Sequence, residues 1–217
     1  MPAATLDPLR KPRLRGVLHR WAFAVSLVAG VGLVVEAGSE RARLAVAVYA
    51  LSVAALFGTS AAYHGVDWRR LGARRWMRRL DHTMIFVLIA GSYTPFALLV
   101  LRGTLGTVIL IMVWSAALAG AMFKLIWIDA PGWLIAITYI AIGWIAVVAI
   151  PELVHGLGVV AVSAVGVGGV LYSVGALVYA RKRPDPVPMV FGYHELFHLL
   201  VILAAALQYA VVAFWVL

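Results

Sequence analysis

The sequence predicts an all-α, polytopic membrane protein, a single domain over residues 1–217 that crosses the bilayer seven times. Three observations predict this fold: an apolar composition, seven apolar segments of spanning length, and basic residues gathered on one side. Hydrophobic residues make up 64% of the chain and charged residues only 12%, about half the charged share of soluble domains. A soluble core cannot bury that much apolar surface, so the bilayer is the expected solvent for most of the chain.

Seven segments are long enough to cross the membrane as helices, which takes about 20 apolar residues each. The first has Arg20 near its start, and no small-residue cleavage site follows it, so we interpret it as a retained span rather than a signal peptide. The third and fourth are separated only by a tight turn at residues 102–104. Glycines in the sixth indicate close helix packing. The predicted spans are Val17–Val35, Leu44–Tyr63, Thr83–Leu101, Leu105–Phe123, Gly132–Ile150, Leu157–Tyr179 and Leu196–Leu217.

The basic residues predict the orientation. With the N-terminus inside, the cytoplasmic segments hold 15 of the 18 Lys and Arg residues, mainly in the tail of residues 1–16 and in the loop of residues 66–80. Only Arg41, Arg43 and Arg102 fall outside. This bias predicts an N-terminus inside and, after seven spans, a C-terminus outside. The net charge of +9 therefore reflects topology, and nucleic acid is not an expected partner.

Four ionisable side chains are expected at one depth, near the cytoplasmic face. His64 ends the second predicted span, Asp81 precedes the third, and His194 and His198 begin the seventh. Ionisable groups at membrane spans are costly and usually functional. His194 and His198 are four residues apart and so share one helix face. Three segments that are distant in the sequence are thus expected to place side chains able to bind a metal at the same depth in the membrane.

The residue types favour zinc. The chain has no cysteine, so a metal must be held by His, Asp or Glu. Three imidazoles, from His64, His194 and His198, would leave the fourth tetrahedral position open, as in catalytic zinc sites. Asp81 would then form a hydrogen bond with the metal-bound water or with a ligand, and Ser60 lies one turn before His64 on the same face.

The other histidines are expected to take no part. His82 follows Asp81 and points about 100° away on a helix. His19 lies in the basic entry to the first span and His155 lies beside Glu152 on the opposite side, so both are expected to be solvated.

One motif points to a different enzyme. Residues 194–198 read His-Glu-Leu-Phe-His, which fits H-E-x-x-H, the metalloprotease helix with Glu as general base. That interpretation makes Glu195 the base of an intramembrane protease. It supplies no third ligand after the motif and gives His64 and Asp81 no role.

The motifs together resemble the hemolysin III family, bacterial relatives of the progestin and adiponectin receptor (PAQR) proteins. The residues that carry the resemblance run from Ser60-Ala-Ala-Tyr-His64, through Leu80-Asp81-His82 and Ala90-Gly91-Ser92-Tyr93-Thr94-Pro95, to His194-Glu195-Leu196-Phe197-His198. The resemblance implies that His64, His194 and His198 bind Zn²⁺, that Asp81 contacts it through water, and that Ser60 belongs to the site. It also implies a multi-pass protein of the bacterial inner membrane.

The receptor relatives are thought to hydrolyse lipid amides such as ceramide. The resemblance therefore implies a zinc-dependent membrane hydrolase in which Asp81 accepts a proton, with membrane lipids as partners and a lipid amide as substrate. Two alternatives stay open: a non-enzymatic sensor of membrane state with a structural zinc, and a cytolysin. Turnover of a lipid amide would separate the hydrolase from the sensor, and dye release from liposomes would indicate the cytolysin.

Overall fold

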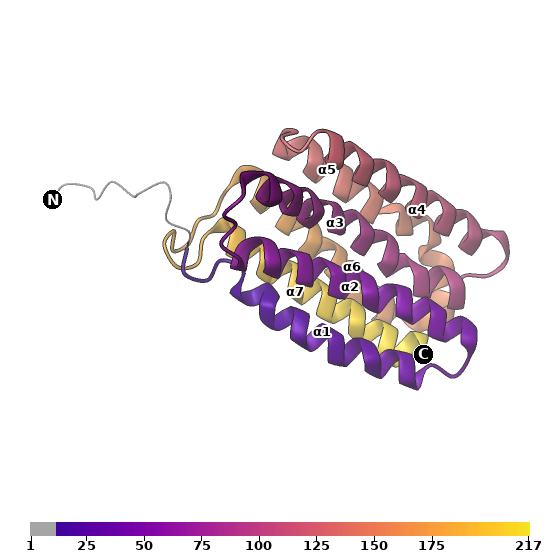
Figure 1. Cartoon of the computed structure of the whole chain (residues 1–217). Coiled ribbons are helices and arrows are strands. Elements are labelled where there is room, and N and C mark those ends of the chain that lie inside the picture. The colour runs from indigo at the N-terminus through magenta and orange to yellow at the C-terminus, as the bar shows by residue number, and fades with distance from the viewer. Residues whose placement is uncertain (1–11) are drawn as a thin grey trace.

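The computed structural model describes residues 12–217, which form a bundle of helices and hold no β-sheet (Figure 1). Most of the predicted tail, residues 1–11, lies outside the described residues. The helices are α1 (Val17–Glu36), α2 (Glu40–Gly65), α3 (Leu71–Leu99), α4 (Gly103–Ile126), α5 (Gly132–Gly143), α6 (Ile150–Arg181) and α7 (Tyr193–Val211), with a 3₁₀ turn η1 (Ile145–Ala149) and a π turn η2 (Val212–Val216).

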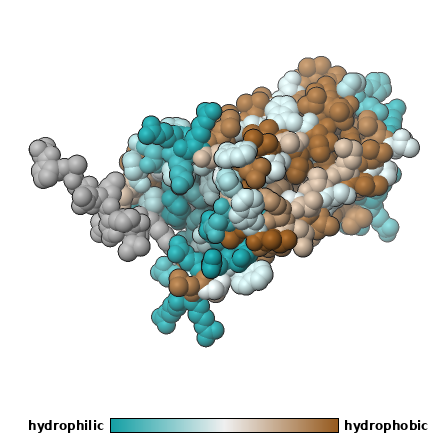
Figure 2. Space-filling view, turned by 90° about the horizontal axis from the view of Figure 1, so that it is seen from above, coloured by the Kyte–Doolittle hydropathy of each residue, from teal (hydrophilic) through white to brown (hydrophobic). Residues whose placement is uncertain are grey.

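Six helical segments among the described residues are long and apolar enough to span a membrane. They are α1, α2, α3, α4, the continuous stretch Gly132–Arg181, and Tyr193–Val216. Figure 2 shows hydrophobic side chains over the middle of the visible face and hydrophilic ones toward its two ends. Large apolar residues such as Trp21, Val28 and Val160 are mostly exposed on the outside of the bundle. An apolar exterior of this kind is suited to lipid.

The stretch Gly132–Arg181 is 50 residues long, and its two ends lie side by side. A Cβ at Gly132 would lie 3.6 Å from the Cα of Ala180, and Trp144 donates a 3.0 Å hydrogen bond to Ser173. The chain reverses at Gly158, whose φ of 82° breaks the helix. The structure differs from the predicted bounds here: the sixth span was expected to begin at Leu157, whereas α6 begins at Ile150, with Pro151 in its first turn, where its fixed φ favours a helix.

The basic segment after α2 also differs from its prediction. Helix α3 begins at Leu71, well before Thr83, so most of its arginines lie on a helix rather than in a loop. Arg78 pairs with Asp129 at 2.8 Å, and Arg79 donates a 2.9 Å hydrogen bond to the carbonyl of Leu125. These two contacts attach the first turns of α3 to the end of α4 and the connection that follows it. Asp81 therefore lies within a continuous helix.

Tyr93 of α3 stabilises the break between α5 and η1. Its hydroxyl donates a 2.6 Å hydrogen bond to the Gly143 carbonyl and accepts a 2.9 Å bond from the Ala146 amide. Backbone groups freed inside a membrane must find partners within the protein. On the same helix, Gly91 lies so close to Ser52 of α2 that a Cβ would collide with its side chain. The segment Ala90–Pro95 therefore sets how α2, α3 and the end of α5 pack.

Helices distant in sequence meet beside the first helix. α1 packs against α2 and α7, and the Tyr49 hydroxyl of α2 donates a long 3.5 Å bond to the Ala205 carbonyl of α7. In Figure 1, the first described residues and the C-terminus lie at opposite ends of the bundle. The end of α2 and the start of α7 therefore come together at the end where the described chain begins.

Candidate metal centre

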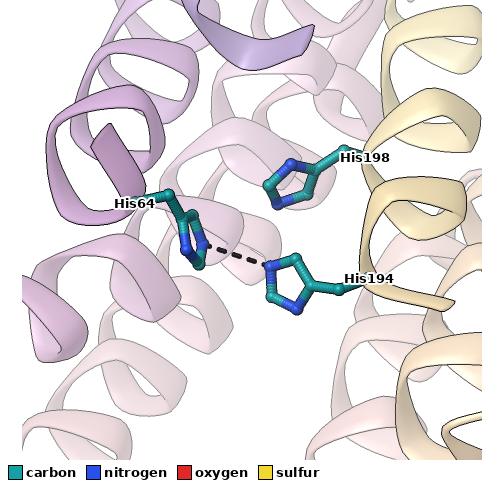
Figure 3. Close-up of side chains that lie close together, drawn as sticks. All are labelled: His64, His194 and His198. Carbon is teal, nitrogen blue, oxygen red and sulfur yellow. Dashed lines mark hydrogen bonds between the residues drawn. The ribbon is translucent and has the colours of Figure 1, made fainter. Parts of the chain in front are cut away.

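Three histidines converge at this end of the bundle. His64 is in the last turn of α2, and His194 and His198 are in the first two turns of α7, with their rings turned toward one another (Figure 3). The Nε2 atoms of His64 and His194 are 3.1 Å apart, and one ring nitrogen from each of the three lies within 4.8 Å of the others. His194 and His198 are buried and His64 is partly buried. This cluster could hold a metal ion.

The geometry of the cluster fits zinc. Two imidazole nitrogens bound tetrahedrally with Zn–N of about 2.0–2.1 Å lie roughly 3.3 Å apart, close to the His64–His194 separation of 3.1 Å. Three imidazole donors are the ligand set of catalytic zinc sites that keep one position open.

Asp81 lies beside the three histidines. Its Oδ2 is 3.7 Å from the Nε2 of His64, too far for a direct hydrogen bond but close enough for both groups to contact one water molecule. The Ser60 side chain is buried and lines the same cavity as Asp81 and the three histidines. The structure thus brings together all five residues singled out from the sequence.

Glu195 is fully buried and both of its oxygens have partners. Oε1 forms an ion pair with Arg15, and Oε2 accepts a 2.9 Å hydrogen bond from the Gly192 amide. This side chain therefore caps the start of α7 and holds the segment that precedes α1. A carboxylate engaged in this way is poorly placed to be the general base that the H-E-x-x-H interpretation requires.

His19 of α1 was expected to be solvated, and that expectation is wrong. It is 2% exposed, its ring stacks on His198 with centroids 3.7 Å apart, and its edge meets Phe57. Its depth in the first span is a signal that could have identified it, since the same depth singled out His64. His155 is exposed, as predicted, and His82 faces Tyr179 rather than the cluster.

A cavity of about 330 Å³ extends from the cluster into the bundle. Arg15, Arg78 and the histidines line one end of it. Leu101, just after the C-terminal end of α3, and Leu153, in the first turn of α6, line the other. Most of the lining side chains between them are apolar. A volume within the usual range of ligand pockets and an apolar wall suit a lipid chain.

Comparisons with known proteins agree with this architecture. Residues 8–209 match the family model described as "Haemolysin-III related". "Hemolysin-3 homolog" of Bacillus subtilis (strain 168) is 31% identical over 202 residues, covering 92% of this chain and 91% of the relative. "Hemolysin-3" of Bacillus cereus is 32% identical over 204 residues, covering 93% and 90%. Human "Monocyte to macrophage differentiation factor" is 24% identical over 165 residues, covering 75% and 66%. The chain is a multi-pass integral membrane protein and belongs to the haemolysin-III-related family.

Proposed function

We propose that this protein is a zinc-dependent hydrolase of lipid amides in the bacterial inner membrane, working at the cytoplasmic side. One observation carries the proposal: three converging imidazoles and a nearby carboxylate lie at one end of a lipid-sized cavity. A closed structural metal site would have no need of an adjoining cavity.

His64, His194 and His198 would hold the ion, which when bound would polarise the amide carbonyl and acidify the attacking water. Asp81 accepts the proton that this water loses as its oxygen bonds to the carbonyl carbon. The same carboxyl group returns the proton to the amide nitrogen as the C–N bond breaks, which yields a fatty acid and an amine. Ser60, which lines the cavity with Asp81, belongs to the same polar end of the site, and His19, stacked on His198, holds that ring in place.

Lipid-amide hydrolysis is tested by metal removal. The purified protein in detergent is expected to release fatty acid from a ceramide-like amide, to lose this activity on dialysis against a chelator, and to regain it with zinc. Full turnover after the zinc has been removed would contradict the proposal. No turnover, with zinc still raising the melting temperature, would instead favour the membrane sensor with a structural metal, and release of dye from liposomes would favour the cytolysin.

We infer further that the chain crosses the membrane seven times, with the N-terminus inside and the C-terminus outside. The adjacency of Gly132 and Ala180 supports two crossings within the stretch Gly132–Arg181. The concentration of 15 of 18 basic residues on one side supports the orientation. The metal cluster then lies near the cytoplasmic face.

Reporter fusions test this topology. A reporter fused after Leu217 should give an extracytoplasmic signal, and one inserted at residues 66–70, between α2 and α3, should give a cytoplasmic signal. A third reporter, in the connection between α6 and α7, should match the second. If the first two reporters gave signals from one side, the chain would cross an even number of times between them, and the seven-span topology would fail.

A further inference from the structure

Apart from the histidines of the cluster and His19, two polar side chains that line the cavity have a buried atom with no hydrogen-bond partner among the described residues. They are Tyr172 of α6, through its hydroxyl, and Gln208 of α7, through Oε1, and both atoms are buried without a partner among the described residues. Both residues line the cavity. Buried polar atoms in native proteins are almost always paired with protein groups, water or a ligand, so these two, named here the deep polar pair, need an explanation.

The helix register places the deep polar pair at one level. α6 and α7 run antiparallel: a Cβ at Gly168 would lie 3.5 Å from the Ala204 carbonyl oxygen, and one at Gly175 would lie 3.5 Å from the Cβ of Leu200. Helical side chains lean toward the N-terminus of their own helix. Tyr172 therefore leans toward the level of Gly168, and Gln208 leans toward the facing level of Ala204, so the two side chains approach each other from opposite sides of that level.

That level is well separated from the histidine cluster. Ala204 lies six residues beyond His198, about 9 Å farther along the helix axis. The nearby lining residues Val165, Val201 and Phe197 are apolar. A lipid held by its amide at the cluster would thus pass the deep polar pair with a part of its chain, not with its head.

The chemistry of the pair selects a hydroxyl group. Gln208 Oε1 only accepts hydrogen bonds, whereas the Tyr172 hydroxyl both donates and accepts. A hydroxyl on the lipid chain can donate to Gln208 and accept from Tyr172 at once. A keto group could only accept, which leaves Gln208 Oε1 unpaired, and a methylene group satisfies neither atom.

We propose that the deep polar pair binds a hydroxyl group carried along the chain of the lipid, so that the protein prefers hydroxylated lipid amides over plain ones. This inference rests on the proposed function only in taking the lipid to be an amide. The preference for a hydroxylated chain is a property of binding, so it can be measured without turnover.

The experiment is displacement of a fluorescent fatty-acid probe from the purified full-length protein. The competitors are fatty acids of one length that carry no oxygen on the chain, a keto group or a hydroxyl, with the hydroxyl moved stepwise along the chain. At the best position we expect the hydroxylated chain to bind about tenfold more tightly than the plain chain, with the keto chain between them, since the net contribution of a hydrogen bond that replaces contacts with water is modest.

Tyr172→Phe and Gln208→Leu should each reduce this preference to a few-fold, and the double variant should abolish it. Both should leave the melting temperature of the lipid-free protein unchanged or raised, because each removes a buried polar atom that has no partner. Tyr209→Phe is the matched control. Its hydroxyl donates to the Ala29 carbonyl and it is not among the residues that line the cavity, so it should lower stability and keep the preference.

Two results would overturn the inference. One is equal displacement by hydroxylated and plain chains, or displacement by neither. The other is a loss of lipid-free stability in Tyr172→Phe and Gln208→Leu with the preference intact, which would mean that the pair binds structural water. Lipid-amide turnover without any chain preference would contradict this inference alone, and hydroxyl preference without turnover would contradict the hydrolase alone.

Discussion

Replacing His194 and His198 together by alanine is expected to abolish zinc binding, from about one ion per chain to none. The double substitution leaves His64 as the one imidazole of the cluster, and a single neutral imidazole at a partly buried site cannot hold the ion against water and chelators. Elemental analysis of purified protein measures the loss directly. Activity on lipid amides should disappear with the metal.

The control for this experiment is His155→Ala. His155 is exposed and far from the cluster, so its loss removes one imidazole from the chain and none from the site. Zinc content should stay at the wild-type value in this variant. Undiminished zinc in the His194→Ala/His198→Ala protein would show that the ion binds elsewhere and would refute the assignment of all three ligands.

Asp81→Asn is expected to retain most of the zinc and to lose most of the turnover. Asp81 lies beside the cluster rather than in it, 3.7 Å from the Nε2 of His64, and loss of a group outside the ligand set typically costs about 10–100-fold in affinity or activity. An amide cannot take the proton of the attacking water. Turnover at matched zinc content should therefore fall by about 10²–10⁴-fold, the usual contribution of a general base.

Glu195→Gln is the matched control. It also replaces a carboxylate by an amide, but on the side chain that the protease interpretation makes the general base. Its carboxylate pairs with Arg15 and caps the Gly192 amide, so the substitution should lower the melting temperature and leave turnover per zinc nearly unchanged. An inactive Glu195→Gln beside an active Asp81→Asn would reverse the assignment of the base.

Much of the fold could be predicted because a membrane-spanning helix can be identified from a run of about 20 apolar residues. Helices α1, α2, α4 and α7 lie within a few residues of the predicted spans. The start of α3 could not be located in this way, because its first turns are basic and lie beyond the apolar run that marks a span. The start of α6 at Ile150, before the predicted start of the sixth span at Leu157, was missed because the reversal depends on a single backbone torsion, that of Gly158.

The candidate site was predicted from depth and helical spacing, and the structure brings all five of its residues together. What depth cannot supply is the identity of neighbouring helices. His19 is at the right depth, but Arg20 beside it indicates water, and only the packing of α1 against α7 reveals that its ring is covered by His198. The partners of Glu195 escaped prediction likewise, since Arg15 is 180 residues away in sequence.

The wide sequence separation of the histidines has a consequence for biosynthesis. His64 and His194 are 130 residues apart, one near the end of the second helix to leave the ribosome and the other at the start of the last. Until α7 has been translated and inserted, the nascent chain carries one imidazole of the cluster and cannot capture metal. The ion pair between Arg15 and Glu195 also cannot form before α7 has been translated. A metal ion held by this cluster would therefore be bound late, after the last helix has been inserted.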